Sequence, residues 1–342
     1  MLYRDEPHPA HAGFANAIDA DLLSLNEYSL DQLGLRYSIP EEILNGLRIP
    51  KYDVYIAEGT RALYGSLLAQ IKNNSTLIYL AGDMSLYKLS DSTYEAESKI
   101  NWIISQFGMN IMKTIFDRYI DGCIAVSQLS KQSTASIINT QNIRVANPYI
   151  QPNLYKKLGS VSPEIQSKTV ITVGTYSRYK GQELLVNAWE RVRAEHPDAT
   201  LHLVGKNYPD SFEQVPGVKV HGYVEDLPKA LARSSLYVQS SRVDAFGVSV
   251  LEALQTGLPA IVTRTTGSST VIKRLSNEMV VEPSSDAIAS GINRYLSLPP
   301  EKKKALSSEA QKLGSEFDSD SKMADFRSEF HTLTEDIGIA ND

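Results

Sequence analysis

The stretch "LYVQSSRVDAFGVSVLEALQTGLPAIVT", from Leu236 to Thr263, contains three successive patterns. The runs at 236–241 and 259–263 are short and largely apolar, as expected of strands in the interior of a parallel sheet. Between them, "VSVLEALQTG" has the spacing of a helix and ends at Gly257, a residue type that commonly terminates helices. The stretch therefore predicts one strand–helix–strand unit with parallel strands.

The same alternation continues along the rest of the chain. In the first half, a helical stretch covers 60–74, and the predicted strands cover 22–27, 53–57, 76–81, 122–127 and 142–148. In the second half, further strands are predicted at 169–176, 199–205, 218–223 and 278–283. Such alternation favours α/β domains with doubly wound parallel sheets, which bind ligands outside the carboxyl ends of their strands. We therefore expect two Rossmann-like domains that face an interdomain cleft.

The expected domain boundaries follow from length and from local composition. The chain has 342 residues, about twice a common domain length. We expect a first domain at 1–150, a polar linker with two prolines at 151–168, and a second domain at 169–318. The segment 319–342 is predicted to be an amphipathic helix that packs back on the first domain. Its apolar face would consist of Met323, Phe326, Phe330 and Leu333.

The composition excludes several kinds of partner and site. The net charge of −6 gives no global basic field, so we expect no nucleic-acid partner. Cys123 is the only cysteine, which excludes an internal disulfide and a thiolate metal cage and fits a reducing compartment. The N-terminal residues include charges and prolines where a signal peptide would be apolar, and no run reaches the length of a membrane span. We therefore expect a cytoplasmic protein, with peripheral contact at the inner membrane face left open.

Two cations follow the predicted strand at 169–176. In "VGTYSRYKG", Gly174 comes at the end of the apolar run, and Arg178 and Lys180 stand just before a helix that begins near Gln182. Cations beside a helix N-terminus favour an anion, because the helix dipole and the side chains attract the same sign of charge. This loop is therefore a candidate site for a diphosphate. The alternative is a solvated basic loop that caps the helix.

Two acids stand on either side of the turn in the opening stretch. Gly247 would let the backbone approach a ligand, and the free N–H groups of Val248 and Ser249 would point at it. Asp244 could accept hydrogen bonds from sugar hydroxyls, and Glu252 could do the same for a ribose diol. Acids near a diphosphate would be repelled unless they bound hydroxyl groups. The alternative is that Asp244 is an ordinary acid near a helix N-cap and that Glu252 is a surface helix residue.

A family resemblance covers most of residues 170–290. The run "GYVEDLPKALARSSLYVQSSRVDAFGVSVLEALQTGLPAIVTRTTGSSTVI" resembles the donor-binding domain of the retaining GT-B glycosyltransferases of family four. Their signature is an acid, seven residues, then Glu, followed by Ala and a Gly-Leu-Pro. "YKGQELLVNAW" resembles their Lys-Gly-helix element, and "GCIAVSQLSKQ" resembles the last strand of their first domain. Over residues 1–120 only the general pattern is similar.

The resemblance implies a role for each candidate in the second domain. Arg178 and Lys180 would bind the donor diphosphate and stabilise the leaving nucleoside diphosphate, near Gly174. The backbone from Phe246 through Gly247 and Val248 to Ser249 would hold the donor sugar and phosphate. Glu252 would bind the ribose and Asp244 the transferred sugar, so the catalytic group would be Asp244, Arg178 and Lys180. The implied mechanism needs no protein nucleophile, no metal and no cofactor.

Three positions depart from the family pattern. The first acid is commonly Glu, where this chain has Asp244, and an arginine often stands where this chain has Thr175. A first-domain histidine is replaced by Gly82, which leaves Asp83 as a candidate on the acceptor side. A turn-capping role is the alternative for Asp83.

The N-terminal loop supplies two further candidates. In the family, a glycine here approaches the donor phosphate or the acceptor, so Gly13 and His11 are candidates for that side. A solvated loop histidine is the alternative for His11.

Three other features are interpreted as structural. The acidic triplets at Asp19–Asp21 and Asp318–Asp320 resemble metal-binding motifs, but the first flanks a strand and the second opens a helix, where acids suit the dipole. The apolar stretch at 100–116 favours a buried helix, with a lipid-facing helix as the alternative.

The resulting hypothesis is a retaining, metal-independent glycosyltransferase that uses a UDP- or GDP-sugar. Its acceptor would be a glycan, a lipid-linked sugar or a small molecule. The alternatives are a catalytically silent nucleotide-sugar-binding subunit and a nucleotide-sugar epimerase or phosphorylase on the same fold.

Overall fold

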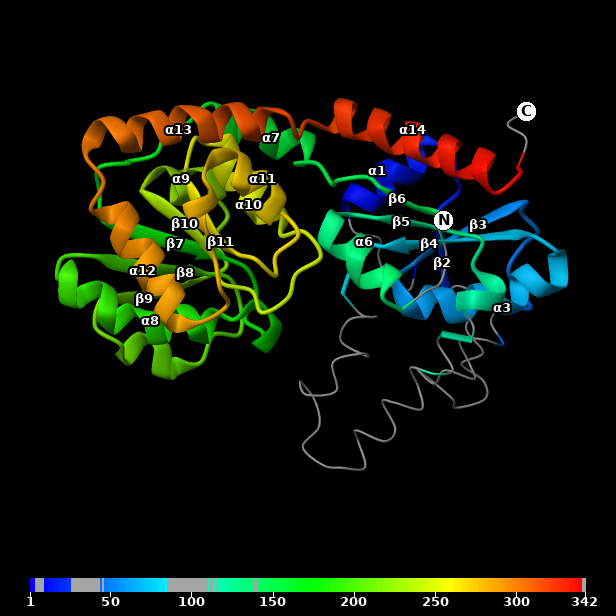
Figure 1. The fold of residues 1–342 in the computed structure, drawn as a ribbon, viewed down its shortest axis with the longest axis horizontal. Coiled ribbons are helices and arrows are strands. Elements are labelled where there is room, and N and C mark those ends of the chain that lie inside the picture. Colours follow the sequence, from blue (N-terminus) through cyan, green and yellow to red (C-terminus); the bar gives the residue numbers. More distant parts are fainter. Residues whose placement is uncertain are drawn as a thin grey trace. The chain divides into compact units, whose positions relative to one another are not determined.

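The computed structural model describes residues 1–3, 9–25, 44, 46–84, 110, 113–114, 116–137 and 141–339, and the statements below concern these residues. The chain forms two compact units (Figure 1). The first unit combines Met1–Pro148 with Lys322–Asp342, and the second is Tyr149–Ser321. Each unit contains one parallel sheet, and each is described by itself.

The first unit is built on a six-stranded sheet in the order β2-β1-β3-β4-β5-β6. The strands are β1 (Leu2–Tyr3), β2 (Leu23–Ser24), β3 (Val54–Glu58), β4 (Thr76–Ala81), β5 (Gly122–Ala125) and β6 (Ile143–Val145). The helices include α1 (Pro9–Ala17), α3 (Gly59–Asn73) and α6 (Gln128–Ala135). All four residues of β5 are buried, as are five of the six in β4, because helices cover both faces of the sheet.

The second unit has its own six-stranded parallel sheet, in the order β12-β11-β10-β7-β8-β9. Its strands are β7 (Thr169–Val173), β8 (Thr200–Val204), β9 (Val218–Gly222), β10 (Leu236–Gln239), β11 (Ala260–Thr263) and β12 (Val280–Val281). The order runs outward from β7 in one direction and from β10 in the other. The carboxyl ends of these two neighbouring strands therefore mark the topological switch point, where open α/β sheets bind ligands.

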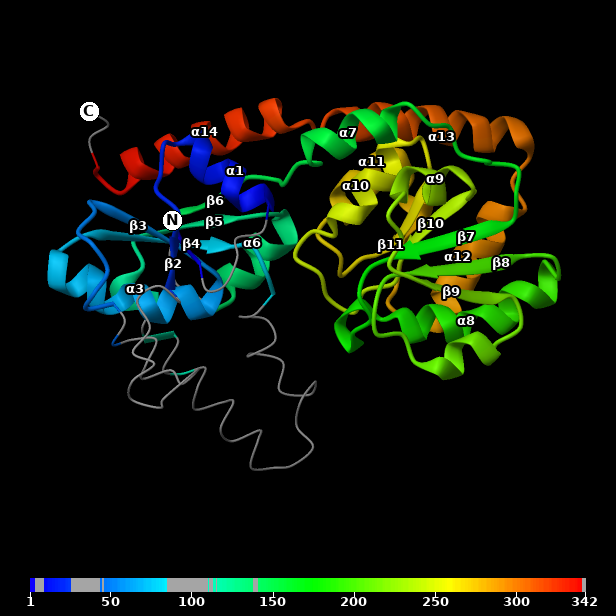
Figure 2. The ribbon, with the colours of Figure 1, turned by 180° about the vertical axis from the view of Figure 1, so that it is seen from behind.

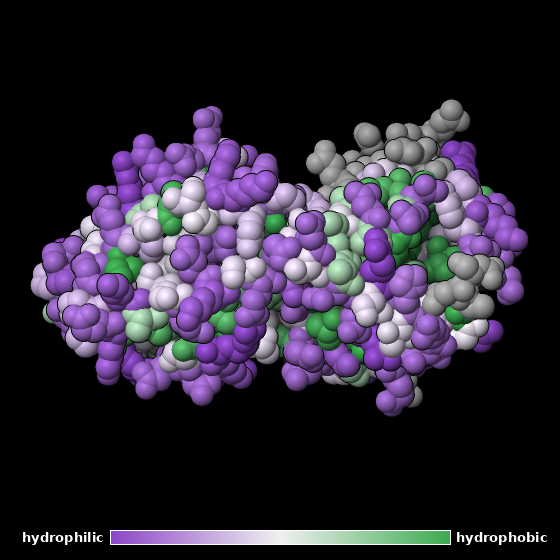
Figure 3. Space-filling view, turned by 90° about the horizontal axis from the view of Figure 1, so that it is seen from above, coloured by the Kyte–Doolittle hydropathy of each residue, from purple (hydrophilic) through white to green (hydrophobic). Residues whose placement is uncertain are grey.

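Helices cover both faces of this second sheet (Figures 1 and 2). One face carries α8 (Gln182–Glu195) and α12 (Ser285–Leu296), which pack against each other. The other carries α10 (Val248–Gln255) and α11 (Ser269–Leu275), with α13 (Pro300–Ser315) packed outside them. The remaining elements are α7 (Pro152–Gly159), α9 (Leu227–Ala232) and the short 3₁₀ turns η3 (Arg178–Lys180), η4 (Asp210–Gln214) and η5 (Asn277–Met279). The outer face of α13 is mostly hydrophilic (Figure 3), as expected of a helix that buries only one side.

These two sheets confirm the expected α/β fold class, and the opening stretch forms β10, α10 and β11 as predicted. The segment 151–168 differs from an open linker, because it contains α7 and belongs to the second unit. Pro152 at the first turn favours a helix start, and Leu158 is buried. Within the predicted strand at 22–27, β2 covers Leu23–Ser24, and residues 26 and 27 lie outside the described residues. Most of the predicted helix at 100–116 lies outside the described residues.

The last helix, α14 (Ser319–Asp336), packs on the first unit. Phe326 is fully buried and stacks on Phe14 of α1, with ring centroids 4.3 Å apart. Leu333 is also fully buried and lies against Gly122 of β5. Arg327 donates a hydrogen bond to the carbonyl of Ala17. Residues near the C-terminus therefore complete a core that the N-terminal half begins.

Among the described helices, none combines the length and the apolar character needed to cross a lipid bilayer. This finding concerns the described residues alone.

We predict that Phe326→Ala lowers the free energy of unfolding by about 3 to 5 kcal/mol, because it removes a fully buried ring from the contact with Phe14. Urea unfolding of the whole chain measures this loss. Ser328→Ala is the matched control, since Ser328 is exposed on the same helix and its replacement should change stability by less than about 0.5 kcal/mol. Equal effects of the two substitutions would contradict the claim that Phe326 stabilises the first unit through its contact with Phe14.

Candidate active site

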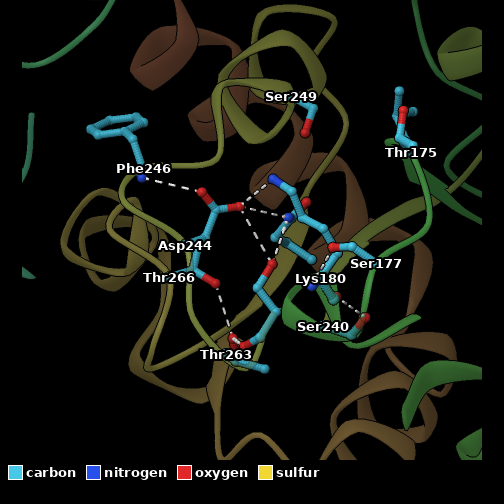
Figure 4. Close-up of polar contacts among 12 residues, drawn as sticks. Thr175, Ser177, Lys180, Ser240, Asp244, Phe246, Ser249, Thr263 and Thr266 are labelled. Atoms are coloured by element: carbon cyan, nitrogen blue, oxygen red, sulfur yellow. Dashed lines mark hydrogen bonds and ion pairs between the residues drawn. The ribbon is translucent and has the colours of Figure 1, made fainter. Parts of the chain in front are cut away.

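The loops that follow β7 and β10 meet at the carboxyl edge of the second sheet (Figure 4). The first loop contains η3 with Arg178 and Lys180, and the second contains Asp244. They approach closely because Gly181 has no side chain: a Cβ there, at a φ of +61°, would lie 2.3 Å from the carbonyl oxygen of Ser240. The backbone N–H of Arg242 also donates to the carbonyl of Tyr179 at 2.8 Å.

The closest polar contact between the two loops joins Lys180 to Asp244. Lys180 Nζ donates to Asp244 Oδ2 at 2.6 Å, and the two side chains are 37% and 11% exposed. Gln239 Nε2 donates to the same oxygen at 3.1 Å, and the backbone N–H of Phe246 donates to Oδ1 at 3.4 Å. The predicted cation and acid therefore come together, and the carboxylate has a fixed orientation.

A second ion pair ties the Asp244 loop to helix α8. Arg242 Nε and Nη2 donate to Glu183 Oε1 at 3.1 and 2.5 Å, and both side chains are about one quarter exposed. The sequence analysis did not identify this pair, although its residues flank the motifs that it did identify. The pair holds the Asp244 loop against the first turn of α8.

The residues from Phe246 to Ser249 lead from the loop into the first turn of α10. Gly247 precedes the helix, so Val248 and Ser249 are its first residues, whose N–H groups have no partner within the helix. The Phe246 side chain is only 3% exposed and lies against Phe317, with ring centroids 6.2 Å apart. Phe246 can therefore offer a ligand only its backbone, which is the role that the resemblance implies.

Glu252 lies one turn further into α10 and is partly buried. Burial raises the pKa of its carboxyl group from 4.5 to about 7. It is therefore not the ordinary surface helix residue of the alternative interpretation. A partly protonated acid at this place can both donate to and accept from a ligand hydroxyl.

Arg178 and Thr175 are exposed in the loop that follows β7. Gln182 fixes this loop, because its Nε2 donates to the carbonyl of Thr175 at 3.2 Å and its Oε1 accepts from the N–H of Ser177 at 3.3 Å. Figure 4 draws no contact from Thr175 to Lys180 or to Asp244.

A cavity of about 610 Å³ opens beside this loop at the carboxyl ends of β7, β8 and β9. It is lined by Gly174, Thr175, Gly205, Lys206 and Tyr223, with residues of α7 on one side. The volume lies within the range of small-molecule sites. Gly174 thus lies where the sequence analysis expected a ligand. The sequence analysis did not identify Lys206, Tyr223 or the contribution of α7. Gly205, which directly follows β8, was the signal in the sequence that could have indicated a ligand site here.

The first unit has a separate cluster at the ends of β3 and β4. His11 is only 5% exposed, and its Nδ1 donates to Glu58 Oε1 at 2.6 Å. The alternative of a solvated loop histidine is therefore wrong, because α1 buries the ring. A Cβ on Gly82 would lie 2.3 Å from His11 Cε1, so the glycine makes room for the imidazole.

The other two candidates of this unit are Gly13 and Asp83. Gly13 is buried inside α1, and the carboxylate of Asp83 lies near Gly59. Glu58 was missed, although an acid at the end of an apolar strand is a recognisable signal.

The acidic triplets have structural contacts. Asp21 Oδ2 accepts from the hydroxyl of Tyr52 at 2.7 Å, and Asp318 Oδ1 accepts from the N–H of Ser321 at 2.9 Å at the start of α14. Within the part of the chain that the structure describes, no three His, Cys, Asp or Glu side chains are grouped in a way that could hold a metal ion.

One family model matches a part of the chain that lies within the second unit. Residues 160–313 match the family model described as glycosyl transferases group 1. The chain is 32% identical over 116 residues to mannosylfructose-phosphate synthase of Agrobacterium fabrum, which is 29% of this chain and 26% of that protein. It is 28% identical over 197 residues to an uncharacterized glycosyltransferase of Methanocaldococcus jannaschii, which is 51% of this chain and 50% of that protein. The chain thus spans half or less of the length of these relatives.

Solved structures match over nearly the whole chain. HepE of Anabaena, solved in complex with UDP and glucose, has a TM-score of 0.72 at 19% identity and covers 97% of this chain and 98% of its own. Sucrose-phosphate synthase of Thermosynechococcus elongatus has a TM-score of 0.73 at 16% identity and covers 98% of this chain and 89% of its own. At these identities the likeness concerns the fold, and it confirms the expected GT-B architecture.

We predict that Glu252→Gln stabilises the protein at pH 8 and has little effect near pH 4.5. The folded-state pKa of about 7 lies above the unfolded value of 4.5, so this group favours folding below pH 4.5 and loses that contribution as pH rises through 7. Glutamine resembles the protonated acid and avoids the loss, which is on the order of 1 to 3 kcal/mol. Urea unfolding at both pH values measures the difference. The same offset at both would contradict a raised pKa.

We also predict that Gly82→Ala destabilises the first unit by about 1 to 3 kcal/mol, because the new methyl group would overlap the His11 ring. The His11→Ala background is the control, since the ring is then absent and the added methyl should cost much less. Urea unfolding of the four proteins checks this. Equal costs in both backgrounds would rule out the proposed close approach.

Proposed function

We propose that this chain is a glycosyltransferase that moves a sugar from a nucleotide-sugar donor to an acceptor. The observation that carries the proposal is the contact between Lys180 and Asp244 beside the first turn of α10. A cation and a helix N-terminus favour the diphosphate, whereas a carboxylate at the same place favours the hydroxyl groups next to it. A nucleotide sugar contains both kinds of group. The match of residues 160–313 to glycosyl transferases group 1 supports the same assignment.

The proposed roles of the second unit follow from this arrangement. Lys180 and Arg178 bind the diphosphate, together with the backbone N–H groups of Val248 and Ser249. Glu252 binds the ribose, and Asp244 binds hydroxyls of the transferred sugar. The cavity at Gly174 receives the nucleoside. These groups favour the transition state, because negative charge accumulates on the diphosphate as the glycosidic bond breaks.

We propose that transfer retains the anomeric configuration and uses no metal. The acceptor oxygen forms its bond to the anomeric carbon on the face that the diphosphate leaves. The bond from that carbon to the phosphate oxygen breaks, and the acceptor proton passes to the departing phosphate. The diphosphate takes the electron pair of the broken bond, and Lys180 and Arg178 offset its charge. In this scheme no side chain becomes covalently attached to the sugar.

The donor is proposed to be a UDP- or GDP-sugar. HepE, solved with UDP and glucose, has the same fold over nearly the whole chain, which supports UDP as the first nucleotide to test. The acceptor is proposed to contact the first unit near His11, Gly13 and Asp83. The hydrogen bond from His11 to Glu58 fixes the orientation of the ring.

We predict that UDP-glucose or another UDP- or GDP-sugar raises the melting temperature of the wild type, because a ligand that binds only the folded state stabilises it. Lys180→Ala should weaken binding of that donor by about 10-fold or more, since it removes a charge-assisted contact to the diphosphate. Asp244→Ala should retain diphosphate binding and lose most turnover. Melting curves and calorimetry measure binding, and release of the nucleoside diphosphate measures turnover.

Arg191→Ala is the control for removal of a cation, because Arg191 is exposed on α8 and pairs with Asp286. It should leave binding and turnover unchanged. Absence of binding by any sugar nucleotide would end the proposal. Binding without turnover on any acceptor would support a silent binding subunit, and a requirement for free phosphate would support a phosphorylase.

A further inference from the structure

A row of buried polar side chains lies beneath the contact between Lys180 and Asp244. Tyr237, Gln239 and Ser241 are 0%, 3% and 0% exposed, and they belong to β10 or follow it directly. Every residue of β10 is buried, so polar side chains in it are costly unless they pair with other groups. These side chains form hydrogen bonds with one another and with Asp244, so they can hold this carboxylate in place.

The direction of each hydrogen bond in this row can be assigned. The ionised Asp244 Oδ2 can only accept, so the group of Gln239 that lies 3.1 Å from it must be the amide nitrogen. The same nitrogen donates to Ser241 Oγ at 2.8 Å. Gln239 Oε1 therefore faces the other way and accepts from the hydroxyl of Tyr237 at 2.8 Å. The Tyr237 oxygen lies 2.8 Å from Ser249 Oγ, whose proton is then available to it.

This row joins two parts of the candidate site. Ser249 is the second residue of α10, and Asp244 lies in the loop before that helix. Tyr237 and Gln239 are two positions apart in β10, so their side chains leave the strand on the same face. Hydrogen bonds between side chains of β10 thus link the Asp244 carboxylate to the hydroxyl of Ser249 in the first turn of α10. Figure 4 shows Asp244 with its contacts to Lys180 and to the backbone of Phe246.

We propose that Gln239 is a positioning residue, which keeps the Asp244 carboxylate in place when Lys180 turns toward the donor diphosphate. The inference rests on the proposed function, because it concerns the same site. The Lys180 side chain is 37% exposed and can reorient, whereas Gln239 is 3% exposed and cannot. Once Lys180 contacts a diphosphate, the carboxylate loses its shortest contact and gains a negative neighbour that repels it. The neutral amide of Gln239 does not compete with Lys180 for the phosphate and stays bound to Asp244.

The contact is tested first without reference to activity, by a double-mutant cycle on urea unfolding of the full chain. Gln239→Leu removes the amide at similar volume, and Asp244→Ala removes its partner. We expect Gln239→Leu to lower the urea midpoint clearly more in the wild type than in the Asp244→Ala background, because the two residues interact directly. Equal shifts in both backgrounds would overturn the inference.

The positioning role is tested by the kinetics of UDP-glucose turnover. Gln239→Leu should lower kcat about 10-fold or more and change the donor KM by less than about threefold, because it misplaces a carboxylate and leaves the diphosphate contacts intact. Gln255→Leu is the matched control, since Gln255 is also a buried glutamine of this unit and contacts the carbonyl of Tyr155 instead. An unchanged kcat in Gln239→Leu would overturn the proposal.

Gln239→Glu gives a readout that a merely structural role would not change. The protonated new carboxyl group can still donate to Asp244, whereas its ionised form repels that carboxylate. The kcat of this variant should therefore fall relative to the wild type as pH rises between about 5 and 8. A pH profile parallel to that of the wild type would count against the inference. If the wild type does not turn over UDP-glucose, the proposed function fails for this donor, and the unfolding cycle still decides whether Gln239 holds the Asp244 carboxylate.

Discussion

The contact between Lys180 and Asp244 is the interaction on which the candidate site depends. The two residues come from loops that follow β7 and β10, which are neighbours at the point where the strand order reverses. The loops can meet because Gly181 leaves room for the carbonyl of Ser240. Any side chain at that position would separate the loops, and the cation would then have no defined relation to the carboxylate.

The electrostatics of this site are local. The chain carries a net charge of −6, yet the loop with Arg178 and Lys180 offers positive charge beside a helix N-terminus. Fields of exposed charges fall off within about 10 Å at moderate salt, so the distant acids do not cancel this attraction. Burial also keeps Glu252 partly protonated near neutral pH, which reduces the negative charge close to a diphosphate. An acidic protein can therefore present a site for an anion.

The first unit depends on residues that are far apart in the sequence. α14 supplies Phe326 and Leu333 to a core that also contains Phe14, so this unit is complete only with the last helix in place. The pair of His11 and Glu58 depends on Gly82 in the same way, since the imidazole occupies the space that a larger residue would fill. The departure from the family pattern at Gly82 thus has a local explanation: a histidine is present beside this position, and it comes from α1.

The sequence by itself determined the parallel sheets, because buried strands such as 76–81 and 122–125 must be apolar on both faces, and this produces short continuous apolar runs. It also determined which loops contain the candidate charged residues, because Arg178, Lys180 and Asp244 stand near glycines directly after apolar runs. Only the tertiary structure decided that α7 forms within the expected linker, and that Gln239, Arg242 and Glu58 contact the candidate residues. A buried polar residue in a strand gives no pattern in the sequence that names its partner. The contacts of Gln239 join residues only two to five positions apart, but they depend on how the loop after β10 folds back on the strand. The pairs of His11 with Glu58 and of Arg242 with Glu183 join residues that are far apart in the chain, so only folding brings them together.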